Sequence, residues 1–227
     1  MNLIGLALDN NFLAGPIPSS FGNMKSLTMM KVFDNQLFGS LPQELTNLTN
    51  LTHFELSKNN FTGYLPPDVC KGGALQRFTV DRNNFVGPIP RSLKNCTSLV
   101  RARLEKNHII GNISRDFGVY RHLKYIDLSY NRLYGELSSN WANCRNLTSL
   151  KIAGNQLTGK IPPEFGDSLQ LHLLDLSSNQ LVGEIPKRLG GLHSLFNLNL
   201  SRNNLFGQIP VEIGKLFNLD AIDLFGK

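Results

Sequence analysis

The side chains best suited to chemistry in this 227-residue sequence are charged and aromatic residues that recur at a regular spacing. We call them the basic stripe: His53, Glu55, Lys58, Arg77, Asp81, Arg82, Arg101, Arg103, Glu105, Lys106, Tyr125, Asp127 and Tyr130. From position 53 to position 106 the stripe has six Lys or Arg residues and three acids, so half of the net charge of +6 falls there. Such a surface can attract and hold an acidic or carboxylate-bearing peptide, with the tyrosines as rigid contacts.

Two arginines of the stripe form the sharpest candidate. Arg101 and Arg103 flank Ala102 on one predicted strand, so their side chains project from one face about 7 Å apart. Planar guanidinium groups suit carboxylates because they donate paired hydrogen bonds. We therefore predict that Arg101 and Arg103 bind a carboxylate.

A solvated lattice of charges is the alternative for the same residues. Asp127 is expected beside Arg103, and Asp81 near Arg82 and Glu105. Exposed pairs of this kind contribute little to stability. An exposed polar strand face is also the ordinary surface of a repeat protein, so both interpretations stay open.

Signals of catalysis or metal binding are missing from the sequence. The five histidines are scattered, and no nucleophile elbow, phosphate-binding loop or HExxH motif occurs. His53 and Glu55 share a strand face, but a lone pair on an open surface lacks a pocket that excludes water. We predict no enzyme activity, no metal and no cofactor for this chain.

The three cysteines are expected to be buried and apolar. Cys96 and Cys144 occupy the same repeat position two repeats apart, roughly 10 Å from each other, which is too far for a disulfide. A Cys70–Cys96 bridge is geometrically conceivable but disfavoured. Burial is favoured over metal or redox chemistry because other repeats place Met or Leu at the Cys96 position.

The elements that must position the stripe come from a repeat of 24 residues without insertion or deletion. Each repeat opens with a leucine, at Leu3, Leu27, Leu51, Leu75, Leu99, Leu123, Leu147, Leu171, Leu195 and Leu219. Counted from that leucine, the pattern is LxxLxLxxNxLxGxIPxxLGxLxx. Position 13 is always Gly, and position 9 is Asn in all nine complete repeats: Asn11, Asn35, Asn59, Asn83, Asn107, Asn131, Asn155, Asn179 and Asn203.

Each position of the repeat has a structural role. The LxxLxL segment is predicted to be a short strand whose leucines point inward, with the intervening residues exposed. The Asn amide can both donate and accept, so stacked asparagines can pair backbone groups that the turn leaves open. Parallel strands about 4.8 Å apart, with bulkier return segments behind them, make the stack curve. We predict an α/β-type repeat solenoid, a curved right-handed superhelix with a parallel sheet on the concave face and short 3-10 or irregular return segments.

The GxIPxxLGxLxx half of the repeat resembles the plant-specific leucine-rich repeat class, which occurs in ectodomains of receptor-like kinases. The segment NISRDFGVYRHLKYIDLSYNRLYGELSSNW, residues 112–141, resembles the male-discoverer-interacting receptor-like kinase group. In it, Ser114 and Ser138 replace the expected prolines, which predicts looser or reshaped return segments. Peptide receptors of the wider class hold a free C-terminus with an RxR strand pair, and Arg101-Ala102-Arg103 resembles that motif in form, although the group is not defined by it.

The repeats predict one domain over residues 1–227. Its complete repeats are 3–26, 27–50, 51–74, 75–98, 99–122, 123–146, 147–170, 171–194 and 195–218, with a partial repeat at 219–227. Lys227 takes the ladder Asn position, and we find no cysteine-paired cap, membrane span or kinase segment. Because solenoid ends normally carry polar caps, we expect an interior segment of a longer receptor or a truncated gene product.

The resemblance implies an extracellular recognition segment of a single-pass plasma-membrane receptor with a cytoplasmic Ser/Thr kinase. Its expected partners are a peptide or protein ligand and a co-receptor with a short leucine-rich repeat ectodomain. The alternative is a secreted inhibitor of cell-wall-degrading enzymes that resembles polygalacturonase-inhibiting proteins. A membrane span and kinase beyond the repeats would indicate the receptor, and a capped end the inhibitor.

Seven N-x-S/T sequons fit a secreted, glycosylated ectodomain: Asn47, Asn50, Asn60, Asn95, Asn112, Asn146 and Asn199. A glycan on Asn199 would cover the strand face of repeat nine. No block of five like charges and no ring-plus-basic pattern occurs, so we expect no nucleic-acid partner. No run of 18 apolar residues occurs, so we expect no direct membrane contact from this segment.

Overall fold

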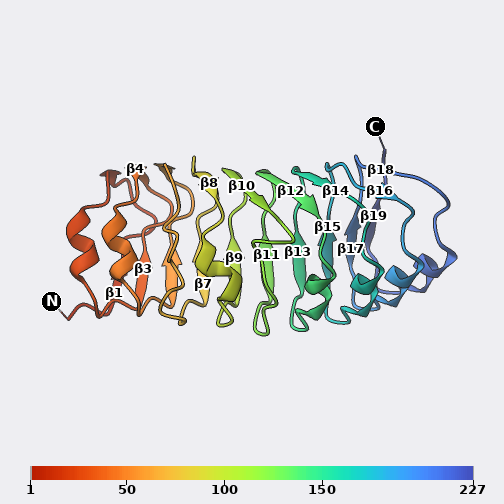
Figure 1. The fold of residues 1–227 in the computed structure, drawn as a ribbon, viewed down its shortest axis with the longest axis horizontal. Coiled ribbons are helices and arrows are strands. Elements are labelled where there is room, and N and C mark those ends of the chain that lie inside the picture. The colour runs from red at the N-terminus through yellow and green to blue at the C-terminus, as the bar shows by residue number, and fades with distance from the viewer. Residues whose placement is uncertain (1, 227) are drawn as a thin grey trace.

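The structure, a computed structural model, describes residues 2–226 as one row of stacked repeats with the two ends of the chain at opposite ends of the row (Figure 1). Met1 and Lys227 are outside the described residues, so the prediction about Lys227 falls outside them too.

A ten-stranded parallel sheet, the main sheet, runs the length of the row in chain order, one strand per repeat. Its register advances by one repeat at each step, so that Arg101 lies between Arg77 and Tyr125 on the neighbouring strands. The strands are β1 (Gly5–Ala7), β3 (Met29–Lys31), β5 (His53–Glu55), β7 (Arg77–Thr79), β9 (Arg101–Arg103), β11 (Tyr125–Asp127), β13 (Ser149–Lys151), β15 (Leu173–Asp175), β17 (Asn197–Asn199) and β19 (Ala221–Asp223).

Smaller parallel sheets follow the turn after each main strand, along the upper edge in Figure 1. They contain β2 (Ala14–Gly15), β4 (Gln36–Ser40) and β6 (Asn60–Thr62); β8 (Val86–Pro88), β10 (His108–Asn112), β12 (Arg132–Glu136) and β14 (Gln156–Thr158); and β16 (Val182–Gly183) with β18 (Asn204–Leu205).

The return segments contain short 3-10 helices, each starting directly after position 16, which is usually Pro. They are η1 (Ser19–Asn23), η2 (Gln43–Asn47), η3 (Arg91–Asn95), η4 (Ser139–Asn143), η5 (Pro163–Asp167), η6 (Lys187–Gly191) and η7 (Val211–Lys215). Among residues 2–226, no helix has the length and apolar character needed to cross a membrane.

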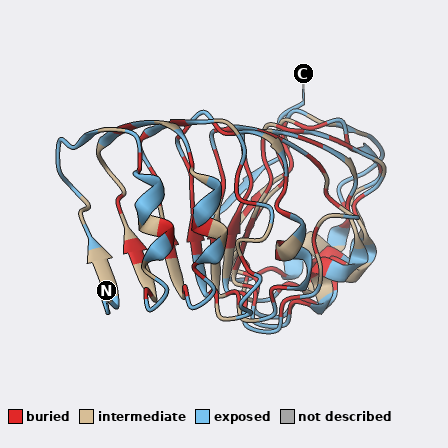
Figure 2. Ribbon diagram, turned by 60° about the vertical axis from the view of Figure 1, so that its left-hand side comes forward, coloured by how far each residue is buried: buried red, intermediate tan, exposed pale blue. Residues whose placement is uncertain are grey.

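The core lies between the main sheet and the return segments, and Figure 2 shows in red the buried residues of both. In repeat five, Leu99, Ala102 and Leu104 occupy positions 1, 4 and 6 and are almost fully buried. Phe54 and Phe78 stack between repeats with ring centroids 6.1 Å apart. Burial of each Leu or Phe contributes about 1.5–3 kcal/mol, so the repeated apolar positions account for the stacking. The predicted fold class is confirmed.

The asparagine ladder works as predicted. Asn83 donates from Nδ2 to the carbonyl oxygens of Leu56, Val80 and Asp81, at 3.0, 3.1 and 3.2 Å. Its Oδ1 accepts the N–H of Phe61, in the preceding repeat, at 3.0 Å. One side chain therefore pairs four backbone groups and joins two repeats.

The two serines that replace prolines have different effects. Ser138 accepts the N–H of Asn140 at 3.1 Å and so caps η4, which keeps the usual form. The segment around Ser114 is reshaped into a turn without a 3-10 helix. The predicted reshaping is therefore confirmed in repeat five, but it is wrong for repeat six because the serine hydroxyl replaces the effect of the missing ring.

The disfavoured disulfide is present, which corrects the prediction for Cys70 and Cys96. Their Cα atoms are 5.9 Å apart and the sulfurs are bonded, whereas Cys144 is free and buried as expected. Cys70 stands at position 20 of its repeat, within a return segment that has turns in place of a 3-10 helix and includes Gly73 with a positive φ of 71°. This departure from the common path brings Cys70 over position 22 of the next repeat.

Candidate functional site

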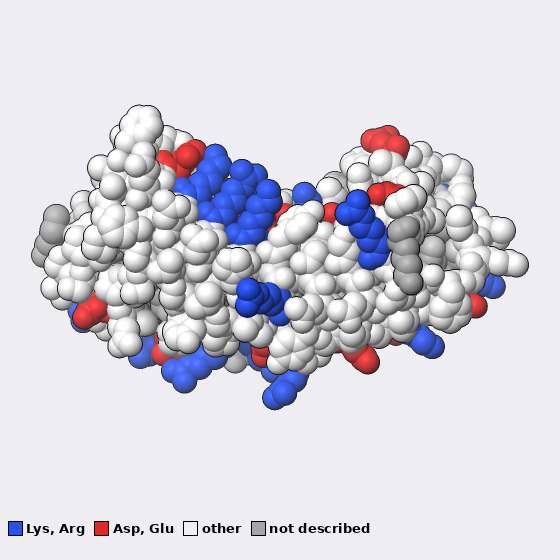
Figure 3. All heavy atoms as spheres, turned by 90° about the horizontal axis from the view of Figure 1, so that it is seen from above, with Lys and Arg blue, Asp and Glu red and all other residues white. Residues whose placement is uncertain are grey.

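Four neighbouring strands of the main sheet, β5, β7, β9 and β11, position the basic stripe. Because every strand has the same register, position 3 of each repeat forms one row: His53, Arg77, Arg101 and Tyr125. Seen from above in Figure 3, Lys and Arg side chains gather in a hollow towards the N-terminal half of the row. Like charges directly opposite on neighbouring strands are unfavourable, so the Arg77–Arg101 pair is not explained by stability.

A second row stands at position 8, where the chain leaves each strand. Lys58, Arg82, Lys106 and Tyr130 are exposed there with positive φ values of 53°, 53°, 57° and 57°. Side chains with a Cβ are strained in this conformation, and Gly, Asn or Asp are the usual occupants. This conformation belongs to position 8 of the repeat in general, since Asn10, Asp34, Ser178 and Arg202 share it, and in the stripe it places three cations and a tyrosine along one rim.

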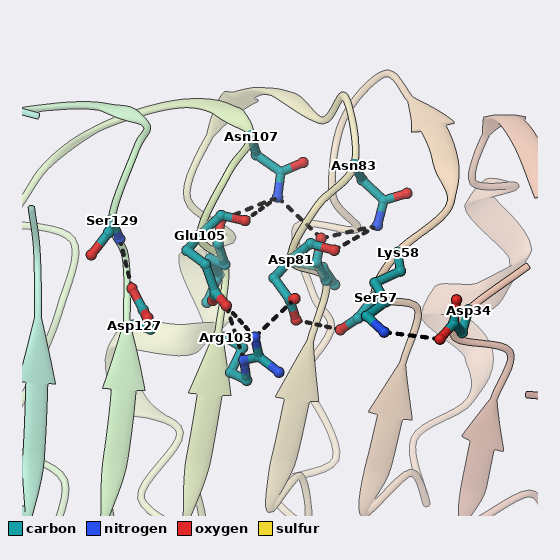
Figure 4. A network of polar contacts seen from close by, with 12 residues as sticks. Asp34, Ser57, Lys58, Asp81, Asn83, Arg103, Glu105, Asn107, Asp127 and Ser129 are labelled. Atoms are coloured by element: carbon teal, nitrogen blue, oxygen red, sulfur yellow. Dashed lines mark hydrogen bonds and ion pairs between the residues drawn. The ribbon is translucent and has the colours of Figure 1, made fainter. Parts of the chain in front are cut away.

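Beneath these cations lies a buried ion network centred on Arg103 (Figure 4). Its Nη2 is 3.1 Å from Asp81 Oδ2, and its Nε donates to Glu105 Oε1 at 3.0 Å. The Ser57 hydroxyl donates to the other Asp81 oxygen. Asp81 is fully buried and Glu105 is 6% exposed, so one guanidinium compensates two buried carboxylates.

Three acids that were predicted to face the ligand are withdrawn from solvent. Asp81 and Glu105 stand at position 7, which turns inward beneath the loop. Asp127, at position 5, is also buried and accepts the N–H of Ser129 at 3.0 Å. Alternation along a strand predicts outward side chains only while the strand continues, and the strands end at position 5.

Withdrawal of the acids leaves most of the cations without a partner. Lys58 pairs with Asp34 at 2.9 Å, and Arg103 is held in the network. No other ion pair within residues 2–226 involves the remaining cations of the stripe, which are Arg77, Arg82, Arg101 and Lys106.

Aromatic and imidazole groups complete the surface. The Arg101 guanidinium lies over the Tyr125 ring, 4.2 Å from its centroid, which orients it by a cation–π contact. Burial, with the charges of Asp127 and Glu105, raises the pKa of Tyr125 to about 12, so its hydroxyl remains a hydrogen-bond donor. Burial also lowers the pKa of His53, so this ring adds no charge near neutral pH.

Two depressions flank Arg103. One, of about 240 Å³, is lined by Phe33, Glu55, Ser57, Lys58, Arg77, Thr79, Asp81, Arg101 and Arg103. The other, of about 230 Å³, is lined by Arg82, Arg103, Glu105, Lys106, Tyr125, Asp127, Ser129, Tyr130, Lys151 and Asp175. Both are open and are lined mainly by polar and charged residues, and they suit successive side chains of an extended ligand better than a reaction that needs exclusion of water.

Sequence reasoning missed several lining residues. Ser57 belongs to the network because position 7 of one repeat reaches position 7 of the next. Lys151 and Asp175 extend the site by two repeats at position 5. The sequence did contain a signal for Ser57 at position 7 of the repeat. This position is Ser in four repeats, but the two repeats after that of Ser57 carry Asp81 and Glu105 there. No cluster of three or more potential metal ligands occurs within residues 2–226.

The sequons fall into two groups. Asn47, Asn50, Asn60, Asn95 and Asn146 are exposed. Of these, Asn50 and Asn146 donate from Nδ2 to the carbonyl oxygens of Lys25 and Arg121, at 2.9 and 2.6 Å. The two other sequon asparagines use their side chains inside turns. Asn112 Oδ1 accepts from Ser114 Oγ at 2.8 Å, and Asn199 Oδ1 accepts from Ser201 Oγ at 2.7 Å.

Glu105 predicts a pH dependence of stability. Burial raises its pKa above the ordinary value of 4.5, Asp127 and Asp81 add to this, and the hydrogen bond from Arg103 opposes it. The folded protein thus binds this proton more tightly than the unfolded chain, so its stability decreases as the pH rises above 4.5. Glu105→Gln removes this loss. We therefore expect the melting temperature of the variant, relative to that of the wild type, to be higher at pH 7 than at pH 4. A difference in melting temperature that is the same at both pH values would contradict this.

Comparisons with known proteins agree with the repeat architecture. The profile of the Leucine Rich Repeat family matches residues 2–24, 50–71, 122–144, 146–168, 170–192 and 194–216, more than half of the 227 residues. A search of curated proteins finds no match to this sequence.

Solved structures of plant receptors are similar over almost the whole chain. The ectodomain of the Arabidopsis receptor kinase HAESA, in complex with an N-terminally extended IDA peptide hormone, has a TM-score of 0.95 at 36% identity and covers 99% of this chain and 38% of that chain. The plant peptide hormone receptor RGFR1 in complex with RGF2 has a TM-score of 0.94 at 30% identity, with 99% and 36% covered. Arabidopsis HAESA in complex with IDA and the co-receptor SERK1 has a TM-score of 0.84 at 37% identity, with 98% and 41% covered. The chain thus spans well under half the length of each of these receptor chains.

Proposed function

The chain belongs to the leucine-rich repeat family, and from this premise we propose that it recognises a peptide or protein ligand as part of the extracellular domain of a plant receptor-like Ser/Thr kinase. The similarity to HAESA and RGFR1, each solved with a peptide hormone, supports the proposal. The parent protein would cross the plasma membrane once, and residues 1–227 would form a single domain of nine complete repeats and a partial one.

The observation that carries this function is the unpaired charge on the main sheet. Arg77, Arg82, Arg101 and Lys106 surround the two depressions and form no ion pair within residues 2–226, because the neighbouring acids are buried. An anionic ligand would supply the missing partners, and at the middle of a surface such pairs affect affinity most. We propose the whole basic stripe as the ligand-binding surface, with Arg77 and Arg101 holding a carboxylate and the buried acids acting through Arg103.

A co-receptor is a second proposed partner. HAESA has been solved with both its peptide and the co-receptor SERK1, which supports a comparable assembly for the parent of this chain. We further propose a relationship to the male-discoverer-interacting group, on the likeness of residues 112–141, and glycosylation at the exposed sequons. The similar structures named above do not favour the secreted inhibitor.

The binding site can be tested by changing two arginines that the network does not use. In the ectodomain that contains this chain, Arg77→Ala together with Arg101→Ala should weaken an acidic peptide selected from a library by on the order of tenfold to a hundredfold. Isothermal titration calorimetry gives the affinity. The melting temperature should change little, because neither side chain forms an ion pair within residues 2–226 and the Arg101–Tyr125 contact contributes only about 0.5–1 kcal/mol.

The matched control is Arg202→Ala, which removes an exposed position-8 arginine of repeat nine outside the stripe. It should leave the affinity unchanged. Equal affinity in the double variant and the wild type would remove the stripe as the binding site. Weaker binding of the C-terminally amidated peptide would support a bound carboxylate.

A further inference from the structure

The row of 3-10 helices on the return side is interrupted at the middle of the chain. Repeats one and two and repeats six to nine each contain a helix, and η1 packs on η2 while η4 to η7 pack in succession. Repeats three and five have turns instead, so η3 of repeat four stands without a helix on either side.

The interruption in repeat five has a local chemical cause. Asn112 Oδ1 accepts the N–H groups of Ser114 and Arg115 at 3.1 and 3.2 Å, and Asp116 Oδ2 accepts the N–H of Asn112 at 2.7 Å. These bonds close a tight turn that competes with a helix, as Asn and Asp side chains often do. Ser114, at the usual proline position, leaves the backbone free to adopt it.

A groove of about 550 Å³ occupies the space beside η3. Its floor is apolar, since Leu65, Ile89 and Pro90 are buried beneath it. Pro67 and Pro88 form exposed walls. Proline has no N–H, and the Pro67 carbonyl already accepts the Ser92 N–H at 3.1 Å, so these walls present mainly apolar rings.

The groove is held rigidly on both sides. Cys70–Cys96 joins the return segments of repeats three and four. On the other side, the buried Tyr120 hydroxyl donates to the Leu93 carbonyl at 3.0 Å. A Cβ on Gly118 would lie 2.1 Å from the Lys94 carbonyl oxygen, so repeat five lies directly against η3.

The charges on the rim are unbalanced towards positive. Arg91 is engaged by Asp68 through two bonds of 2.9 Å, and Asp116 is used by the turn. Lys94 and Arg115 are exposed and form no ion pair within residues 2–226. An occupant therefore needs an apolar group for the floor and carboxylates for the two free cations.

We propose that this groove is a second docking surface, distinct from the main sheet, which binds an extended acidic segment of a partner protein through one apolar side chain flanked by carboxylates. An extended segment can place an apolar residue on the floor while its neighbours turn outward to Lys94 and Arg115. Apolar burial supplies affinity, and the charges supply orientation and association rate.

The test uses the full chain and a fluorescent peptide, acetyl-Asp-Glu-Leu-Glu-Asp-amide, in fluorescence polarisation at low salt. The amidated end removes the terminal carboxylate. Because the side-chain carboxylates of the probe could still bind the basic stripe, every measurement on the groove is made in the Arg77→Ala/Arg101→Ala background. Lys94→Glu with Arg115→Glu should weaken binding on the order of tenfold or more. Lys187→Glu is the matched control, because Lys187 occupies the same repeat position as Arg115 but lies on η6 in the uninterrupted row. It should leave the affinity unchanged.

Two further measurements distinguish binding in the groove from nonspecific electrostatic attraction. Replacement of the peptide leucine by glycine should weaken binding on the order of tenfold, since the apolar contact is lost. Asn112→Glu with Ser114→Pro copies the helix-forming sequence of repeat eight, and should abolish binding without lowering the melting temperature.

The proposal is overturned if the leucine and glycine peptides bind equally, if Lys187→Glu weakens binding as much as the groove variant, or if the Asn112/Ser114 variant still binds. Because these measurements are made without the Arg77 and Arg101 side chains, the outcome of the main-sheet test does not enter them. The two proposals can therefore fail independently.

Discussion

Arg103→Met is expected to lower the free energy of unfolding by about 3 kcal/mol, because it removes the one cation shared by two buried carboxylates. Asp81 would retain only the Ser57 hydroxyl, and Glu105 would lose its hydrogen-bond donor. We take the lower part of the range for buried pairs because the Arg103 side chain is 29% exposed, which lets water replace part of its effect. Urea unfolding followed by circular dichroism measures the change.

A rescue variant distinguishes loss of charge balance from loss of packing. Repeats three and four already carry neutral residues at the positions concerned, Ser57 at position 7 and Thr79 at position 5. Asp81→Ser, Arg103→Thr and Glu105→Ser together copy these residues, and they remove both buried acids with their cation without placing a new charge opposite Asp127. We expect the triple variant to recover most of the stability lost in Arg103→Met.

The rescue also bears on why the network exists. A fully recovered triple variant that no longer binds the library peptide would indicate that the network orients Arg103 for the ligand, at no benefit to the fold. Equal instability of the triple and the single variant would contradict the electrostatic explanation, since the buried charges would then not be its cause.

Asn83→Ala is expected to lower the free energy of unfolding by roughly 2–3 kcal/mol, since two amide N–H donors and the acceptor of the Phe61 N–H are lost, at about 1 kcal/mol each. The N–H of Phe61 loses its acceptor in a region that is closed to solvent. The three carbonyl oxygens each lose one donor but keep another, which is Asn59 Nδ2 for Leu56, Asn107 Nδ2 for Val80 and the Lys58 N–H for Asp81. The effect spans two repeats, because Leu56 and Phe61 belong to the repeat before Asn83. Chemical denaturation again provides the measurement.

The neighbouring residue supplies the control. Asn84 has the same side chain but is exposed, and its side chain forms no hydrogen bond with any described residue. Asn84→Ala should therefore change the stability by no more than about 0.5 kcal/mol. If the two alanine variants lose the same stability, the ladder does not hold the repeats together.

Much of the fold could be predicted from the sequence, because the same local pattern of residues recurs in every repeat. The leucine spacing predicted the strands and their inward faces, and Asn at position 9 predicted the ladder. A one-residue error in register would have exposed every leucine, so ten repeats in phase leave a single solution. The row of Arg77, Arg101 and Tyr125 follows from the same register.

The candidate site was predicted only in outline. The exposed cations were identified, but Asp81, Glu105 and Asp127 were expected on the surface and are buried. Arg103 was expected to be free for a ligand and is partly committed to Asp81 and Glu105. Period and alternation describe positions within a strand, and these residues stand where strands end or where one repeat contacts the next.

The sequence by itself determined which residues face outward along the strands, because a 24-residue period and a two-residue alternation act on each repeat separately. The tertiary structure alone decided which carboxylates turn inward, which cysteines meet, and where the helix row is interrupted. These depend on distances between side chains of adjacent repeats and on turns closed by Asn112 and Asp116, where small differences in backbone path change the partner of a charge or a thiol. Such differences do not change the period, so they cannot be read from it.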